Sequence, residues 1–121
     1  MTTQSIVGLV ILLMLSALFV GGAQPQAAGM LLAPWDKLAH GAFFLVFTFS
    51  LTRLASLSIG SVIVFSLLVG AADEIHQFFL PGRFAGWDDW FADALGTGAG
   101  LLTSCLLSNF HTSRMALTDE D

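Results

Sequence analysis

Four long apolar segments, separated by short stretches that carry charged residues, proline or glycine, divide the chain. The first lies near the N-terminus, and its central part, Ser5–Gly22, is almost entirely apolar. The other three predicted segments cover residues 36–51, 59–80 and 88–113. A helix needs about 20 mostly apolar residues to cross the hydrocarbon core of a bilayer. The pattern therefore predicts an all-α, polytopic membrane protein, a bundle of four transmembrane helices.

The first helix, predicted over Ser5–Gly22, has a signal peptide as its competing interpretation. The small residues from Gly21 to Ala23 have the character of a cleavage site. However, no positively charged residue precedes the apolar run, and the run is longer than the usual core of a signal peptide. We therefore expect an uncleaved helix, a single four-helix domain over residues 1–113 and a short acidic tail over residues 114–121.

The second helix is expected to start at the membrane interface. Trp35 is typical of an interfacial anchor, and Asp36 is predicted to cap the helix. The helix should run to about Leu51, with Arg53 at the far interface. His40 follows Asp36 by one helical turn, so we expect a carboxylate–imidazole contact of the kind used in acid–base catalysis. The alternative is that Asp36 only caps the helix and His40 is an interfacial polar group.

The third helix ends in a group of polar side chains. A run without Asp, Glu, Lys or Arg, residues 54–72, leads directly into Asp73, Glu74, His76 and Gln77. Ionisable groups at a membrane boundary are costly and are often functional. Residues three apart share a helical face, which places Asp73 beside His76 and Glu74 beside Gln77.

Glu74 is the most consequential of these residues, because it lies inside the end of an apolar helix. One interpretation is a structural ion pair with Arg83 or Lys37. The other is a functional role as a proton carrier, a metal ligand or a substrate contact. Pro81 and Gly82 then end the helix, since proline lacks an N–H and glycine permits the turn.

The fourth helix is expected to open at Asp88 or Asp89, where carboxylates are stabilised by the unpaired amide groups of the first turn. Asp89 and Asp93 lie four residues apart on one face, so their charges repel and a positive partner is expected nearby. Arg83 is the leading candidate, because its planar guanidinium can bridge two carboxylates. A bound cation is the second candidate.

Small residues recur every four positions on the same helix, at Ala92, Gly96 and Gly100. Such a stripe lets another helix approach closely, and it is expected to face either the third helix or a second copy of the chain. Four short helices expose much surface, so a homodimer is one expected partner. From His111 onward the chain is predicted to be an exposed, mobile tail.

An even number of spans places both termini on one side and the first and third loops on the other. Most ionisable groups therefore gather at one end of the bundle. The positive-inside rule gives a tie, because Lys37 and Arg83 lie on one side of the membrane and Arg53 and Arg114 on the other. Because the first two lie among acidic residues, we discount them, which predicts cytoplasmic termini and an external polar end.

Composition narrows the function classes. Hydrophobic residues make up 55% of the chain and charged residues 11%, as expected for a membrane protein. Four Lys and Arg residues are too few to form a nucleic-acid footprint, so no nucleic acid is expected as a partner. A single cysteine, Cys105, excludes an internal disulfide. No spacing matches a known metal-ligand, cofactor or nucleophile motif, so neither a metal nor a cofactor is predicted.

Three polar blocks occur in order, and together they are specific: Asp36-Lys37-x-x-His40, then Glu74-x-x-Gln77 with Pro81-Gly82-Arg83, then Asp89-x-x-x-Asp93-x-x-Gly96. From about Trp35 to Gly100 the chain resembles the VanZ-like family of small bacterial integral membrane proteins. Many members carry Asn where this chain has Asp93, which makes the site here more acidic.

The resemblance implies a multi-pass protein of the bacterial inner membrane and cell envelope, in a family named after a member linked to low-level teicoplanin resistance. Three functions stay open: binding or transport of a lipid, lipid-linked precursor or amphipathic compound; an enzyme acting on an envelope lipid or its phosphate; and a structural subunit. Candidate ligand-binding or proton-coupling residues are Asp36, Lys37, His40, Asp73, Glu74, His76, Gln77, Arg83, Asp89 and Asp93. Candidate turn and packing residues are Pro81, Gly82, Gly96 and Gly100.

Overall fold

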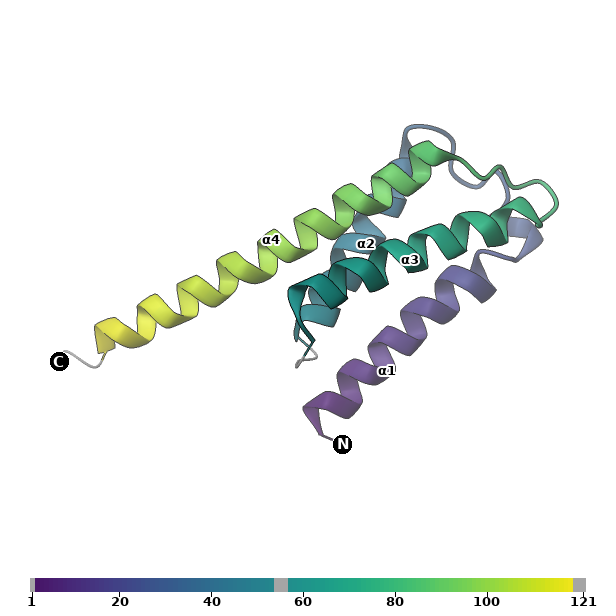
Figure 1. Cartoon of the computed structure of the whole chain (residues 1–121). Coiled ribbons are helices and arrows are strands. Elements are labelled where there is room, and N and C mark those ends of the chain that lie inside the picture. Colours follow the sequence, from purple (N-terminus) through teal and green to yellow (C-terminus); the bar gives the residue numbers. More distant parts are fainter. Residues whose placement is uncertain (1, 54–56, 119–121) are drawn as a thin grey trace.

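The structure is a computed structural model that describes the backbone of residues 2–53 and 57–118, and side chains within this range as far as residue 110. Within these residues all regular secondary structure is helical (Figure 1), which confirms the predicted all-α class. The elements are α1 (Thr3–Ser16), continued by the π-helical turn η1 (Ala17–Gly21), then the 3-10 turn η2 (Pro25–Ala27), α2 (Trp35–Arg53), α3 (Ile59–Phe78) and α4 (Trp87–Thr118).

The start of α2 and the end of α3 differ from the prediction. α2 begins at Trp35, so Asp36 lies in the first helical turn and not at the capping position. α3 ends at Phe78, two residues before the predicted end at Leu80. The chain has already begun to turn there, and Gly82 adopts a φ of +75°, a conformation that glycine enters without steric cost.

Hydroxyl side chains cap two helices at their N-termini. The hydroxyl of Thr2 accepts a hydrogen bond from the Ser5 amide at 3.2 Å at the start of α1. Ser58 accepts one from the Ser61 amide at 3.1 Å at the start of α3. Each cap satisfies a backbone N–H that has no partner within the helix.

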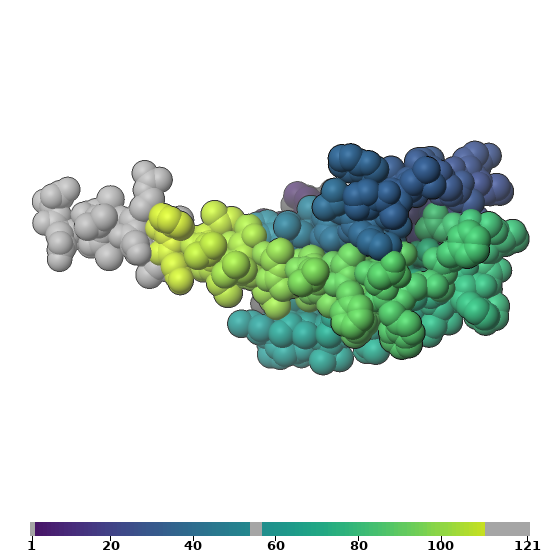
Figure 2. Space-filling model, turned by 90° about the horizontal axis from the view of Figure 1, so that it is seen from above, coloured from purple at the N-terminus to yellow at the C-terminus, as the bar shows by residue number. Residues whose placement is uncertain are grey.

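The helices alternate in direction, so the predicted parity of the loops is confirmed. The α1–α2 and α3–α4 connections lie at one end of the bundle, and the two chain termini point toward the other (Figure 1). α2 packs most extensively against α4, and α3 also packs against α4. Figure 2 accordingly shows α4 running between α2 and α3 on one face of the molecule. α1 lies at the periphery, and none of its described side chains is buried.

Gly96 and Gly100 allow α2 and α4 to approach closely. A Cβ at Gly96 would collide with the backbone carbonyl oxygen of Gly41, and one at Gly100 would lie 2.5 Å from that of Leu45. The predicted close approach is therefore confirmed. The expected partner was wrong, because the stripe faces α2 and neither α3 nor a second chain.

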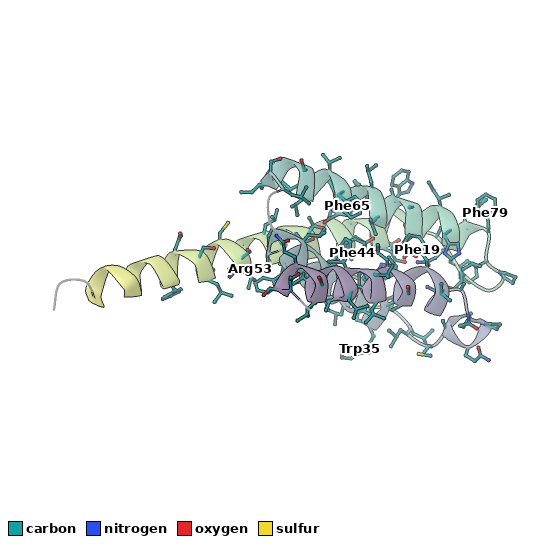
Figure 3. The ribbon with its side chains drawn as sticks, turned by 90° about the horizontal axis from the view of Figure 1, so that it is seen from below. Phe19, Trp35, Phe44, Arg53, Phe65 and Phe79 are labelled. Atoms are coloured by element: carbon teal, nitrogen blue, oxygen red, sulfur yellow. The ribbon has the colours of Figure 1, made fainter. Side chains whose placement is uncertain are left out.

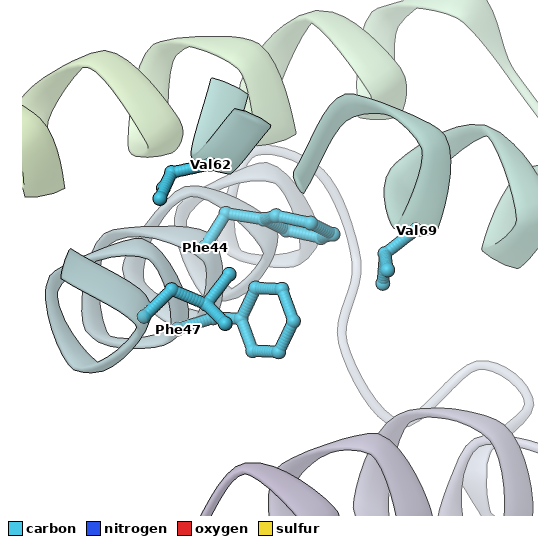
Figure 4. Packing of buried hydrophobic residues seen from close by; sticks show 5 residues of the cluster. Phe44, Phe47, Val62 and Val69 are labelled. Carbon is cyan, nitrogen blue, oxygen red and sulfur yellow. The ribbon is translucent and has the colours of Figure 1, made fainter. Parts of the chain in front are cut away.

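The apolar core lies between α2 and α3. Its buried members are Phe44, Phe47 and Leu51 from α2 and Val62 and Val69 from α3 (Figure 4). Phe44 and Phe47 pack edge to face, with ring centroids 5.9 Å apart. This close packing is important because lipid supplies little hydrophobic drive for helices to associate.

Buried hydroxyl groups add hydrogen bonds between helices. Thr48 of α2 and Ser66 of α3, both fully buried, place their hydroxyl oxygens 3.0 Å apart. Thr52 donates to the Ser104 hydroxyl of α4 at 2.9 Å. In an apolar environment such bonds fix the rotation of each helix, since an unpaired hydroxyl would be costly.

Three helical stretches are long and apolar enough to cross a membrane: Thr3–Gly21, Ile59–Phe78 and Trp87–Phe110. α2 is more polar at its ends but also runs the length of the bundle (Figure 1). Large apolar side chains cover the outside, and Trp35 and Phe79 are 64% and 75% exposed (Figure 3). The chain is therefore an all-α membrane protein.

α4 is longer than predicted. It continues as a helix through Thr118, so residues 111–118, which were expected in a mobile tail, have a helical backbone. In Figure 1 this C-terminal part extends past the other three helices. The acidic residues 119–121 lie outside the described part of the chain.

Candidate functional site

The polar residues predicted from the sequence converge at the end of the bundle that holds the α1–α2 and α3–α4 connections. They come from the start of α2, the end of α3, the α3–α4 connection and the start of α4. We call them the polar cluster: Asp36, Lys37, His40, Asp73, Glu74, Gln77, Arg83, Asp88, Asp89 and Asp93. The cluster forms because antiparallel helices of similar length return each loop to the same end.

Lys37 is the positive centre of the cluster. Its Nζ lies 2.7 Å from Asp88, 2.9 Å from Asp89 and 3.3 Å from Asp36. The residue projects from the first turn of α2 toward the first turn of α4, where two adjacent carboxylates meet it. A flexible ammonium with three donors suits this arrangement of three carboxylates.

Arg83 does not hold the carboxylates of α4, so the sequence-based expectation was wrong. Its Nη1 donates to the backbone carbonyl of Ala27 at 3.1 Å. Within the described residues Arg83 forms no ion pair. The Pro81–Gly82 turn directs the side chain toward the α1–α2 connection, and Arg83 therefore links the two loops at this end of the bundle.

The predicted contact between His40 and Asp36 is not formed, and His40 pairs with Asp93 of α4 instead. The Nδ1 atom of His40 lies 2.8 Å from Asp93 Oδ1, and the two side chains are 13% and 0% exposed. Asp36 is instead engaged by Lys37, its neighbour in the chain. The contact orients the imidazole ring and leaves Nε2 available for another partner.

Gly70 of α3 makes room for this buried pair, a role that the sequence analysis missed. A Cβ at Gly70 would lie 2.8 Å from Asp93 Oδ2. Within the described residues that oxygen is buried and has no hydrogen-bond partner. The only signal in the sequence was a glycine about one turn before the polar end of the third helix. A lone glycine of this kind is too common in membrane helices to indicate a specific role.

Glu74 is held by the backbone of the α3–α4 connection. Its Oε2 accepts a hydrogen bond from the Gly86 amide at 2.7 Å, whereas Oε1 is buried without a partner among the described residues. The ion pair with Arg83 or Lys37, which was one of the two interpretations of Glu74, is not formed. One carboxylate oxygen therefore remains available inside the protein.

Asp73 and His76 are not partners, and neither are Glu74 and Gln77. Gln77 donates to Asp73 at 2.7 Å, one full helical turn away, and both side chains are buried. His76 lies outside the polar cluster, with its ring centroid 5.6 Å from that of Phe19 in α1. Helical spacing predicted which residues share a face of α3, but the pair that forms is Asp73 with Gln77, four residues apart, and not the predicted pairs three residues apart.

His40, Glu74 and Asp89 form a group whose chemistry suits a metal ion. One ligand atom from each lies within 4.8 Å of the others, and the three residues come from three different helices. The sequence predicted no metal because ligand spacing along the chain was the only available criterion. Ligands that meet only through tertiary packing leave no such spacing.

A cavity of about 570 Å³ opens onto the polar cluster. One part of its lining is polar and includes His40, Asp73, Gln77, Arg83 and Asp89. The remainder is mainly apolar and comes from η1, the α1–α2 connection, α2 and the α3–α4 connection. A second, mainly apolar cavity of about 460 Å³ lies between α3 and α4, beside Glu74.

Comparisons with known proteins add one finding. A search of the curated proteins and a search of the solved structures each returned no match. A family model matches residues 3–108, and this range includes α1, which the sequence resemblance did not cover. The chain belongs to the VanZ/LLP1 family.

Proposed function

We propose that the chain binds a lipid, a lipid-linked precursor or a related amphipathic compound of the bacterial cell envelope in the larger cavity. The observation that carries this proposal is the division of the cavity lining into a polar floor and apolar walls. We place the protein in the inner membrane, with its termini in the cytoplasm and the polar cluster on the outer side.

The walls and the floor suit different parts of one ligand. Leu18, Met30 and Phe43 offer apolar surface to an acyl or isoprenoid chain. On the floor, the guanidinium of Arg83 has donors left for a phosphate, because its hydrogen bond to the Ala27 carbonyl uses Nη1 alone. The nearby carboxylates of Asp73 and Asp89 favour an ammonium or hydroxyl group. A zwitterionic head group therefore fits this floor best.

The direct test is mass spectrometry of the lipids retained by protein purified in a mild detergent. Asp73→Asn keeps the shape of a side chain that lines this cavity and removes its charge, and we expect the variant to fold and to lose the retained ligand. Arg53→Gln is the control, because Arg53 lies at the opposite end of the bundle, over the Phe49 ring. Equal ligand in wild type and Asp73→Asn, or no enriched ligand in wild type, would contradict the proposal.

The family's association with teicoplanin resistance supplies a second readout. Bacteria that express the wild-type chain should tolerate more teicoplanin than cells with an empty vector, and Asp73→Asn should remove the difference. Unchanged tolerance with retained lipid would separate ligand binding from resistance.

A structural role is the second candidate, and one observation favours it. Every carboxylate of the polar cluster accepts at least one hydrogen bond or ion pair from a protein donor. A network of this kind can clamp three helices together without any ligand. Under this alternative Glu74→Gln lowers the melting temperature in detergent, and wild type retains no specific lipid.

A further inference from the structure

We propose that His40, Glu74 and Asp89 bind a divalent transition-metal cation at the centre of the polar cluster. The proposal goes beyond ligand binding in the cavity and does not depend on it. It rests on geometry, on the orientation of the imidazole ring and on the balance of charge in the cluster.

The three donors lie at distances that a single ion can bridge. Their ligand atoms lie within 4.8 Å of one another. An ion with bonds of about 2.1 Å holds tetrahedral ligands about 3.4 Å apart and opposite octahedral ligands about 4.2 Å apart. The 4.8 Å limit exceeds both values, so the ligand atoms draw closer together when an ion binds.

The surroundings of His40 are those of a metal ligand. Asp93, which is fully buried, accepts from Nδ1 at 2.8 Å and so leaves Nε2 for the metal. A histidine that ligates a metal usually donates its other N–H to a carboxylate in this way. Asp93 thus acts as a positioning residue, and Gly70 provides the space that it occupies.

Glu74 supplies the donor that the protein leaves unused. Its Oε2 is fixed by the Gly86 amide, so the orientation of the carboxylate is set. Its Oε1 is buried and has no hydrogen-bond partner within the described chain. A buried carboxylate oxygen without a donor is costly, and a cation would remove that cost.

The charge of the cluster also favours a cation. Six of its side chains are carboxylates, and only Lys37 and Arg83 carry a permanent positive charge. Lys37 is shared by three of the carboxylates, and Arg83 contacts a backbone carbonyl instead. One divalent ion bound by His40, Glu74 and Asp89 would offset much of the remaining negative charge.

The donor set indicates which metals fit. One imidazole nitrogen with two carboxylate oxygens suits Zn²⁺ or Mn²⁺, whereas Mg²⁺ and Ca²⁺ prefer ligands that are all oxygen. Three protein ligands leave at least one coordination position open. His40 and Asp89 both line the larger cavity, so the open position faces it.

The test starts from full-length protein purified in detergent and stripped of metal with a chelator. Titration with Zn²⁺ or Mn²⁺ should give about one ion per chain, with Mg²⁺ and Ca²⁺ bound at least about tenfold more weakly. His40→Ala, Glu74→Gln and Asp89→Asn should each weaken binding by more than about 100-fold. Asp93→Asn should weaken it by about 10- to 100-fold, as expected for a positioning residue.

Asp88→Asn is the matched control. Asp88 is a carboxylate beside Asp89, pairs with the same Lys37 and lies outside the three-ligand group. The affinity of this variant for Zn²⁺ should stay within about threefold of wild type. An equal loss of affinity in Asp88→Asn and Asp89→Asn would mean that only the total negative charge attracts the ion, and it would overturn the proposal.

A measurement on wild type alone covers the case in which a ligand variant does not fold. Pulsed electron paramagnetic resonance of bound Mn²⁺ should detect coupling to one imidazole nitrogen. Absence of that coupling, or no saturable binding of Zn²⁺ or Mn²⁺, would overturn the proposal. Retained lipids are measured in the same preparations. Metal without lipid removes only the proposed function, and lipid without metal removes only the cation site.

Discussion

Replacing Gly100 with alanine tests whether the close approach of α2 and α4 sets the geometry of the bundle. A Cβ at Gly100 would lie 2.5 Å from the backbone carbonyl oxygen of Leu45 and 3.1 Å from the backbone nitrogen of Phe49. The first separation is 0.9 Å shorter than 3.4 Å, the lower limit of ordinary van der Waals contact. Because the obstacle is helix backbone and not a flexible side chain, the two helices must move apart.

The cost can be estimated with a matched control. Overpacking a core by a methyl group costs about 1–3 kcal/mol, and alanine recovers up to about 1 kcal/mol through its higher helix propensity. Gly98→Ala gains the same propensity, but a Cβ there meets nothing within 4 Å. The propensity therefore cancels, and the free energy of unfolding of Gly100→Ala should be about 1–3 kcal/mol below that of Gly98→Ala.

Both variants should be purified in the same detergent and unfolded by a denaturant titration followed through tryptophan fluorescence. We expect Gly98→Ala to match or exceed wild type and Gly100→Ala to unfold at a lower denaturant concentration. Equal midpoints for the two variants would refute the reasoning, because they would mean that α2 and α4 are not held in contact at this glycine.

Three further predictions concern single contacts. Lys37→Met removes the common partner of Asp36, Asp88 and Asp89, so the melting temperature of this variant in detergent should fall. Lys37→Arg should retain most of the stability, and an equal loss in both variants would show that charge alone is not the cause. Arg83→Lys should be nearly as stable as wild type, because a lysine can still donate to the Ala27 carbonyl. Arg83→Ala should make the α1–α2 connection more sensitive to limited proteolysis, and an unchanged cleavage rate in this variant would contradict the loop-linking role. Thr48→Val leaves the buried Ser66 hydroxyl unpaired at nearly constant volume and should cost about 1 kcal/mol in unfolding free energy, a cost that Thr48→Val with Ser66→Ala should largely relieve.

The sequence by itself determined the architecture and the location of the candidate site. The lengths of the apolar runs relative to a bilayer predicted the helices, and Pro81–Gly82 predicted the end of α3 to within two residues. An even number of helices then placed the first and third loops together. That result needs only chain connectivity and bilayer thickness, so no knowledge of helix rotation was required.

Only the tertiary structure decided which polar groups are partners. The sequence paired Asp36 with His40 and assigned Arg83 to the carboxylates of α4. The structure instead pairs His40 with Asp93, and Lys37 contacts Asp88 and Asp89. Partners across helices depend on the rotation of each helix about its axis and on the distance between axes. Backbone contact at glycines and buried hydroxyl pairs set these quantities, and neither leaves a readable period in one helix alone. The convergence of His40, Glu74 and Asp89 has the same origin, since three helices must each present the correct face before one ion can reach all three.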